Sequence, residues 1–557
     1  MKDNWITHKA DSLVGSFYDQ QSYQFQQEGF ETTLSFGTAG IRGQFGLGPG
    51  RLNRYTIQRL ALGIAYYLQD NMAQPSIVIH YDIRHLSAEF ADIIAHILAS
   101  HHIKVYVSDT YQTTPQLSYA VRYLQTSAGI MITASHNPKD YNGIKVYGAD
   151  GAQLDDVASL EVAKYIEQLD DPLHLDIELN ETLIKENILP LPKDINQYYF
   201  AEINQLIGDI PPSNLNVVYT SLHGTGTPII PKVLSHLHFN KIELVDAQCK
   251  IDPDFSSVKS ANPEEHEAFD LAIKQAQYSK ADLIIATDPD VDRMGFVERD
   301  HDGHIHYFNG SEIGALMIKY LVDYRTLPKQ PVMIQSIVSG ELGKRFAKQH
   351  GVTVKEVLIG FKFIAKAIRE LREDETFIFA YEESYGYLAG EFVRDKDAIQ
   401  VVPLVIKYAS ILKNEGKTLH DALTDIYEEV GYYRDQPTSK IFEGKKGQQE
   451  IATLMEHLRQ HIPDTLGGLK VIAVEDYQSQ ERINKDDGTT ESIALPKSNV
   501  IRLIFDEGFV ALRPSGTEPK LKFYLSLNVD DFEQVSHDIY QYCLLYTSDA
   551  ADDLLCV

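Results

Sequence analysis

Residues 76–109, SIVIHYDIRHLSAEFADIIAHILASHHIKVYVSD, decide the fold class of this chain. The apolar, β-branched run at 76–82 predicts a buried strand, the amphipathic segment 88–101 predicts a helix, and 103–109 predicts a second strand. A strand, a helix and a strand in this order are typical of a parallel sheet with a crossover helix on one face. The sequence therefore predicts an α/β protein.

The same alternation of strands and helices recurs twice further along the chain, which predicts three α/β units of similar layout. The end of the chain differs, because 469–477, 500–516 and 521–528 indicate a mostly antiparallel sheet with flanking helices such as 447–461. A length of 557 residues fits three or four domains at about 150 residues each. The further strands are expected at 129–135, 215–222, 241–247, 281–287, 331–340, 352–360 and 376–381.

The composition excludes several classes of partner. The chain carries 51 basic and 79 acidic residues, a net charge of −28, so its surface repels nucleic acid and anionic membranes. No run approaches the ~20 apolar residues that span a bilayer, and the N-terminal sequence lacks the apolar core of a signal peptide. Three cysteines are too few for a disulfide framework. We therefore expect a cytoplasmic protein.

The last residues, 543–557, read CLLYTSDAADDLLCV and resemble the translation of a sequencing-library adapter. We expect this segment to be an adapter-derived artefact and leave it out of the fold prediction. The alternative is a natural acidic tail.

The segment 133–148, TASHNPKDYNGIKVYG, follows a predicted strand, and ligands of α/β sheets bind at the carboxyl ends of strands. Ser135 lies at the strand end beside His136, and Lys145 follows ten residues after the serine. A serine in a rigid loop can carry a phosphoryl group, and a nearby lysine can pair with phosphate and transfer protons. The alternative is a turn-rich connection with an incidental serine.

The segment 288–293, DPDVDR, follows the next unit's strand and places Asp288, Asp290 and Asp292 at alternate positions. Three carboxylates and a phosphate oxygen suit Mg²⁺. A calcium-binding EF-hand loop is excluded, because its sixth position is Arg293 rather than glycine. A solvated acidic turn is the alternative, but crowded aspartates repel one another without a cation. The pattern therefore favours a metal site.

Two later loops carry groups that suit a phosphorylated sugar. In YEESYGY (381–387), Glu382 and Ser384 can bind sugar hydroxyls, although a helix N-cap is the alternative. In RPSGTEPK (513–520), an arginine, two hydroxyls and a glycine have the composition of a phosphate cradle, although a charged hairpin loop is the alternative. The early segment FGTAGIRG (36–43) follows no clear strand, so a dinucleotide fingerprint is not expected there.

Taken in this order, the segments from FGTAGIRG to RPSGTEPK resemble the α-D-phosphohexomutase family, the phosphoglucomutases and phosphomannomutases. The resemblance implies four domains around a central cleft: three α/β domains with mixed sheets and a C-terminal TATA-binding-protein-like α+β domain. On this basis the expected domains are 1–205 with the phosphoserine loop, 206–310 with the metal loop, 311–425 with the sugar-binding loop and 426–542 with the phosphate-binding loop.

The resemblance also assigns roles to residues. It implies that Ser135 carries the phosphoryl group and, with Asp288, Asp290 and Asp292, holds Mg²⁺. The residues expected to assist catalysis are Arg42, His136, Lys145 and Arg293. Those expected to bind substrate are Lys362, Glu382, Ser384, Arg513, Ser515, Gly516 and Thr517. One departure is Ile359, because relatives commonly have threonine at this position; its effect on sugar selectivity stays open.

The activity implied is that of an isomerase working by intramolecular phosphotransfer. It would interconvert glucose 1-phosphate and glucose 6-phosphate through a phosphoserine enzyme and glucose 1,6-bisphosphate, which also serves as activator. Mannose and pentose phosphates are alternative substrates. A non-catalytic sugar-phosphate sensor and a metal-dependent phosphatase are alternatives of other classes. The expected partners are small sugar phosphates, and the expected assembly is a monomer or weak homodimer.

Overall fold

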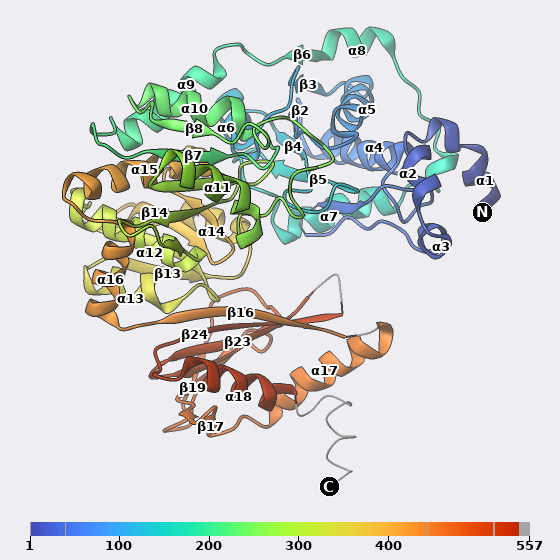
Figure 1. The fold of residues 1–557 in the computed structure, drawn as a ribbon. Helices are drawn as coiled ribbons and strands as arrows, with labels where there is room; N and C mark the ends of the chain where they lie inside the picture. Colours follow the sequence, from blue (N-terminus) through green and yellow to red (C-terminus); the bar gives the residue numbers. More distant parts are fainter. Residues whose placement is uncertain (1, 39, 443, 516–518, 545–557) are drawn as a thin grey trace.

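The computed structural model describes residues 2–38, 40–442, 444–515 and 519–544. Its large sheets each form the centre of one domain, and the C-terminal domain lies below the other three in Figure 1, in contact with the third. The first three domains combine parallel and antiparallel strands with covering helices, so the predicted α/β class is confirmed. Within the described ranges, no helix is long and apolar enough to cross a membrane.

The first domain is built on a six-stranded sheet of order β1-β5-β4-β2-β3-β6, in which β4, β2, β3 and β6 run parallel and β5 is antiparallel to both of its neighbours, β4 and β1. Its strands are β1 (Ile41–Gln44), β2 (Ser76–Tyr81), β3 (Lys104–Val107), β4 (Ala128–Ile132), β5 (Tyr141–Gly148) and β6 (Ile188–Pro190). Its helices are α1 (Lys2–Thr7), α2 (Gly15–Gln20), α3 (Tyr23–Glu31), α4 (Arg54–Asn71), α5 (Ser87–Ser100), α6 (Thr114–Leu124), α7 (Asp156–Glu167) and α8 (Glu181–Asn187), and α9 (Ile195–Ile207) leads to the next domain.

The second domain has the strand order β11-β10-β9-β7-β8, and the third has the order β13-β12-β14-β15. The elements of the second are β7 (Val217–Thr220), α10 (Gly226–His236), β8 (Ile242–Leu244), α11 (Asp270–Ser279), β9 (Leu283–Thr287), β10 (Met294–Arg299) and β11 (Ile305–Tyr307). Those of the third are α12 (Gly310–Tyr324), β12 (Pro331–Ser336), α13 (Glu341–Gln349), β13 (Thr353–Val357), α14 (Phe361–Arg369), β14 (Thr376–Glu382), β15 (Gly386–Leu388), α15 (Ala398–Asn414) and α16 (Leu419–Val430).

The C-terminal domain is an antiparallel seven-stranded sheet of order β16-β24-β23-β22-β19-β20-β21. Helices α17 and α18 cover one face (Figure 1), as the sequence predicted for this part of the chain. Its elements are β16 (Arg434–Ile441), α17 (Gly444–Gln460), β17 (Thr465–Leu466), β18 (Leu469–Lys470), β19 (Ala473–Asp476), β20 (Glu481–Asn484), β21 (Thr490–Ser492), β22 (Ile501–Phe505), β23 (Gly508–Pro514), β24 (Lys520–Leu527) and α18 (Phe532–Leu544).

The first three sheets share one feature that places the predicted site. In each, a strand of the parallel set continues through a hairpin into an antiparallel strand: β4 into β5, β9 into β10 and β14 into β15. The three hairpins contain Ser135, the three aspartates and the loop after Glu382. The loops therefore occupy equivalent positions at the carboxyl ends of three sheets, where ligands of α/β proteins bind.

Two strands differ from the sequence prediction. Residues 141–148 were expected to belong to one long loop but form β5, and β1 begins in the glycine-rich segment 36–43. Both strands contain glycine, which weakens a strand signal. In β5 the glycine is required, because a Cβ at Gly143 would lie 2.7 Å from the carbonyl oxygens of Ile41 and Thr133.

Candidate active site

Ser135 is held in an uncommon backbone conformation at the end of β4. Its φ is +50°, in the left-handed region that non-glycine residues rarely adopt, and its side chain is buried. Thr133 Oγ1 accepts a hydrogen bond of 2.8 Å from the Ser135 amide, and His136 Nδ1 lies 3.1 Å from Ser135 Oγ. Strained conformations of this kind concentrate at functional sites, and this one fixes the direction of the serine hydroxyl.

The serine loop is held by Arg84, a residue that the sequence analysis did not single out. Arg84 is buried, and its Nη2 donates a hydrogen bond of 2.5 Å to the Ser135 carbonyl. It also donates to the carbonyls of Asn137, Pro138 and Tyr141. One guanidinium therefore fixes four carbonyl oxygens of the loop. The signal in the sequence was an arginine three residues after the end of the buried strand β2.

The three aspartates meet at one point. Oxygens of Asp288, Asp290 and Asp292 all lie within 4.8 Å of one another, and each residue is buried. Asp288 Oδ2 accepts a hydrogen bond of 2.6 Å from Ser135 Oγ. Oδ1 of Asp290 and Oδ1 of Asp292 have no hydrogen-bond partner although they are buried. Buried carboxylate oxygens without a hydrogen bond cost free energy, so this arrangement fits a divalent cation, and oxygen ligands suit a hard cation such as Mg²⁺.

Two lysines balance part of this negative charge. Lys145 Nζ lies 3.1 Å from Asp290 Oδ2 and 3.4 Å from Asp292 Oδ2, and Lys396 Nζ lies 3.2 Å from Asp292 Oδ2. Burial acts to raise the pKa of Asp292, but Lys396 and Lys145 outweigh it and hold this pKa below its usual range. For Asp288, burial and the other two aspartates raise the pKa well above its usual value. The aspartates therefore differ in their affinity for a proton.

Lys396 was also not predicted from the sequence. Two structural features show that it belongs to the site. Its side chain crosses Gly386, where a Cβ would lie 2.1 Å from Lys396 Cδ, so the glycine of YEESYGY makes room for the lysine. Asp395 Oδ1 lies 3.2 Å from Lys396 Nζ, and Asp395 also accepts hydrogen bonds from Tyr147 and Gln153 of the first domain. The alternating charges of DKD at 395–397, directly before a helix, were the available signal.

The predicted assisting residues lie around the same point. Arg293 pairs with Glu264, and its amide donates a hydrogen bond of 3.0 Å to Asp288 Oδ1. Arg42 Nη1 donates to Asn137 Oδ1 at 2.9 Å. Burial, with Arg293 and Arg42, lowers the pKa of His136 well below its usual value, so this imidazole is neutral near pH 7. The serine is therefore surrounded by fixed cations and a neutral histidine.

The third domain closes one side of the site. Glu382 is buried at the end of β14, and its Oε1 accepts a hydrogen bond of 2.8 Å from the Gly360 amide. The bridge between Arg293 and Gly386 joins this loop to the metal loop, and Ser384 lies within the turn. Lys362 is directed to the first domain, where its Nζ donates to Asp156 Oδ1 at 2.5 Å and to the Thr38 carbonyl at 3.0 Å.

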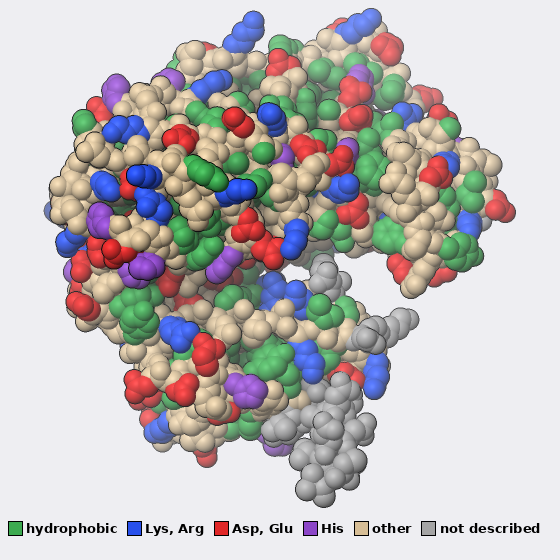
Figure 2. Space-filling model, in the orientation of Figure 1, with side chains coloured by type: hydrophobic (Ala, Val, Ile, Leu, Met, Phe, Trp, Pro, Cys, Tyr) green, Lys and Arg blue, Asp and Glu red, His purple; other side chains and the backbone are tan. Residues whose placement is uncertain are grey.

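The fourth predicted loop lies on the C-terminal domain, which is separated from the first by a cleft visible in Figure 2. Arg513 and Lys522 are register partners in β23 and β24, and Lys520 lies two residues before Lys522, at the start of β24. Burial, Arg513 and Lys520 lower the pKa of Lys522. Three crowded cations suit a phosphate. Ser515 donates its amide to the Lys520 carbonyl at 2.7 Å, and the predicted Gly516 and Thr517 lie outside the described residues.

Comparison with known proteins gives matches along nearly the whole chain. Family models described as phosphoglucomutase/phosphomannomutase, alpha/beta/alpha domains I, II and III, match residues 33–172, 197–303 and 309–430. The chain is 72% identical over 542 residues to a phosphoglucomutase of Staphylococcus haemolyticus, covering 97% of this chain and 99% of the relative. It is 57% identical over 541 residues to one of Staphylococcus aureus, covering 97% of each.

The fold also resembles a solved phosphoglucomutase of Paramecium, in its open form, with a TM-score of 0.67 at 16% identity, covering 93% of this chain and 96% of that one. At this identity the likeness concerns the fold alone. The family models and the two bacterial relatives carry the assignment, since they cover most of the chain. The chain therefore belongs to the phosphoglucomutase/phosphomannomutase family.

Proposed function

We propose that this protein is a phosphoglucomutase that interconverts glucose 1-phosphate and glucose 6-phosphate through a phosphorylated Ser135. The observation that carries the proposal is the hydrogen bond of 2.6 Å from Ser135 Oγ to Asp288 in the buried aspartate cluster. It joins a nucleophilic hydroxyl to a metal-binding set of carboxylates. Relatives with 57% and 72% identity that are named phosphoglucomutase support glucose as the sugar.

The proposed reaction has two balanced transfers. In the first, a free sugar hydroxyl attacks the phosphorus on Ser135, the P–Oγ bond breaks, a P–O bond to the sugar forms, and Oγ takes up the proton that the hydroxyl loses. This gives glucose 1,6-bisphosphate. In the second, Ser135 Oγ attacks the other phosphorus of the turned intermediate, and the released sugar oxygen takes up the serine proton. The enzyme returns to its phosphorylated form.

The residues around Ser135 have separate proposed roles. Asp288, Asp290 and Asp292 would hold Mg²⁺, which supplies charge stabilisation to the transferring phosphoryl group. Burial opposes the charge on Lys145, but Asp290 and Asp292 raise its pKa above the usual value, so the amine is protonated. Lys145 therefore suits charge stabilisation and proton donation better than proton abstraction. The proposed part of Arg42, His136 and Arg293 is to orient the phosphoryl oxygens.

The remaining predicted residues are proposed to hold the substrate away from the reacting atoms. Glu382 and Ser384, with Lys362, would bind sugar hydroxyls. Arg513 and Ser515 would bind the phosphate that does not react, as part of the predicted loop that also contains Gly516 and Thr517. The proposed division of the chain near residues 205, 310 and 425 gives each domain one of the four loops.

A coupled assay with glucose 1-phosphate and Mg²⁺, with and without trace glucose 1,6-bisphosphate, tests this function. We expect formation of glucose 6-phosphate that the bisphosphate stimulates. Mannose 1-phosphate and a pentose 1-phosphate in the same assay measure the alternatives. Faster turnover of either would replace glucose as the substrate, and steady release of inorganic phosphate without isomerisation would indicate a phosphatase.

A further inference from the structure

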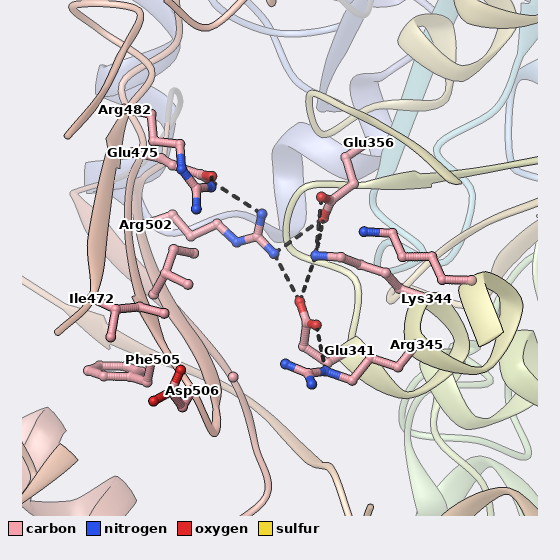
Figure 3. A pocket seen from close by; sticks show the side chains of 13 residues that line it. Glu341, Lys344, Arg345, Glu356, Ile472, Glu475, Arg482, Arg502, Phe505 and Asp506 are labelled. Carbon is pink, nitrogen blue, oxygen red and sulfur yellow. Dashed lines mark hydrogen bonds and ion pairs between the residues drawn. The ribbon is translucent and has the colours of Figure 1, made fainter. Parts of the chain in front are cut away.

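The C-terminal domain meets the third domain around one buried cation. Arg502 lies on β22 and is 2% exposed. Its Nη2 lies 3.3 Å from Glu341 Oε1 and 3.2 Å from Glu356 Oε1, both in the third domain. Its Nη1 lies 3.4 Å from Glu475 Oε2 on β19 of its own domain. Figure 3 shows the guanidinium between the two domains, with the carboxylates directed toward it.

Each of these carboxylates has a second cation from its own domain. Lys344 binds Glu341 and Glu356, with Nζ–oxygen distances of 2.8 and 3.2 Å, and Arg482 pairs with Glu475. The charges of Glu356, Glu475 and Glu341 outweigh the burial of Arg502 and raise its pKa. The guanidinium is therefore permanently charged and needs carboxylate partners where it is buried, and two of its three partners come from the third domain.

The network is not enclosed by close packing. A cavity of about 480 Å³ lies against it, lined by both domains. Beside it, a small apolar cluster joins Ile337, Val338 and Leu358 of the third domain to Val500 and Phe509 of the C-terminal domain. Because part of the contact borders an open cavity, ion pairing rather than packing fixes its geometry there. Loss of one crossing pair leaves room for the domains to shift.

The strand that carries Arg502 is the neighbour of the strand that carries Arg513. Arg502 and Ala511 are register partners between β22 and β23, and Arg513 follows Ala511 by two residues. Hydrogen-bonded neighbouring strands move together as one sheet. The orientation that Arg502 imposes on the sheet therefore also sets where Arg513 lies relative to the third domain and Ser135.

We propose that Arg502 is a positioning residue: its ion pairs with Glu341 and Glu356 hold the C-terminal domain in the orientation that brings the phosphate-binding loop to the cleft. The proposal rests on the proposed function of Arg513 as a phosphate ligand. Without the crossing pairs, the C-terminal domain samples more orientations, and a smaller fraction of molecules presents both halves of the substrate site. The apparent affinity for substrate falls by that fraction, whereas the chemistry at Ser135 is unchanged.

Two carboxylates on the same guanidinium give a matched pair of variants. Glu356→Gln removes a crossing pair, together with one contact to Lys344 of its own domain. Glu475→Gln removes a pair within the C-terminal domain and changes the contacts of this carboxylate to Arg482 and Tyr477 of its own domain. Both changes are isosteric and both remove one charge next to Arg502. Any difference between them reports the crossing between domains.

The experiment measures KM and kcat for glucose 1-phosphate and the radius of gyration by small-angle X-ray scattering. We expect Glu356→Gln to raise KM about 10-fold with kcat within about 3-fold, and to alter the scattering profile. We expect the two variants to lower the melting temperature by similar amounts. Glu475→Gln, however, should leave KM and the scattering profile unchanged. Equal effects of the two variants on KM, or no effect of Glu356→Gln, would overturn the proposal.

A third variant guards against misfolding. If Glu356→Gln does not fold, Glu356→Asp keeps the charge but shortens the side chain, and we expect it to give a smaller rise in KM in the same direction. The scattering comparison separates this proposal from the proposed function, because it needs no turnover. If the wild-type protein is inactive, the proposed function is wrong. If Glu356→Gln, but not Glu475→Gln, still alters the scattering profile, the positioning role of Arg502 is retained.

Discussion

Ser135 Oγ donates a hydrogen bond of 2.6 Å to Asp288 Oδ2, although the two residues are separated by 153 positions in the chain. Ser135 follows β4, which leads into the hairpin of the first domain, and Asp288 follows β9, the equivalent strand of the second. The site therefore exists only where two domains meet. Any shift between these domains separates the proposed nucleophile from the aspartates that are proposed to bind metal, so the proposed reaction requires their relative position.

The aspartate cluster predicts a stabilising effect of Mg²⁺. In the wild-type protein, Mg²⁺ is expected to raise the melting temperature, because a ligand at 100 times its Kd stabilises by about 2.7 kcal/mol. Asp290→Asn should weaken this effect and raise the Mg²⁺ concentration needed for half-maximal activity by at least about 10-fold. Thermal unfolding with increasing Mg²⁺ measures the first effect, and an activity titration measures the second.

The control is Asp302→Asn, which lies in the other cluster of potential metal ligands, with Asp300 and His304. This second cluster is partly exposed and distant in sequence from the serine loop. We expect the control to behave as the wild type. Equal loss of Mg²⁺ stabilisation in both variants would contradict the assignment of the metal site.

Arg84 predicts a loss of loop geometry. Arg84→Ala leaves the carbonyls of Ser135, Asn137, Pro138 and Tyr141 without their donor, at a cost of about 1–3 kcal/mol for each buried group that stays unpaired. We expect a clear fall in melting temperature and a reduction of kcat by about 10- to 100-fold. Arg84→Lys should recover only part of the activity, because an ammonium cannot make the forked contacts of a guanidinium. A fully active Arg84→Lys variant would contradict the proposed role of the Arg84 guanidinium in holding the serine loop.

Arg513 predicts a binding defect without a chemical one. Loss of one charged hydrogen bond to phosphate costs about 1.5–3 kcal/mol, which corresponds to a rise in KM of about 10- to 100-fold. We expect Arg513→Ala to show this rise with a smaller change in kcat. Lys497→Ala, a loss of one exposed positive charge in the same domain, serves as the control for net charge. A large fall in kcat at unchanged KM would show that Arg513 acts at the reacting phosphate instead.

Asp397 predicts a pH dependence of stability. It caps α15 by accepting from the Ile399 and Gln400 amides and also accepts from Tyr199, and burial raises its pKa to about 7. The usual value is 3.8, so between these values the folded protein binds more protons than the unfolded chain, and stability falls as pH rises. Between pH 6 and 8 the contribution of this group is about 1 kcal/mol.

Asp397→Asn keeps an acceptor at the cap but removes the titration. We expect the free energy of unfolding of this variant to change less between pH 6 and 8 than that of the wild type, as measured by urea unfolding at both pH values. Asp421→Asn, at the start of the neighbouring helix α16, is the matched control with an exposed carboxylate. A pH dependence identical to that of the wild type would contradict the role of Asp397.

The fold class was predictable because the parallel strands are buried on both faces and so read as continuous apolar runs, as in 281–287. The antiparallel strand β5 and its neighbour β1 were harder to predict. β5 contains Gly143 and Lys145, and β1 is only Ile41–Gln44. Their place in the sheet depends on pairing with β4 and with each other, which is a tertiary property that no local pattern records.

The residues of the site also differ in how well the sequence predicts them. Ser135 and the aspartates follow strong strands and belong to compact motifs, so the sequence indicates them. Arg84 and Lys396 act through long side chains that reach other loops, and Lys396 comes from a different domain than the aspartate it pairs with. Arg502 is more remote still, because its role depends on carboxylates of another domain. Such contacts follow from domain packing rather than from local sequence.

The most direct test of the account is the site of phosphorylation. Wild-type protein and Ser135→Ala are incubated with glucose 1,6-bisphosphate, and mass spectrometry of the intact proteins and their peptides locates the phosphoryl group. Ser159→Ala, a buried serine of α7 outside the site, is the control. We predict one phosphoryl group on Ser135 in the wild type and the control, none in Ser135→Ala, and at least about 1,000-fold less isomerase activity in that variant. A phosphoryl group on another residue, or a fully active Ser135→Ala enzyme, would contradict the account.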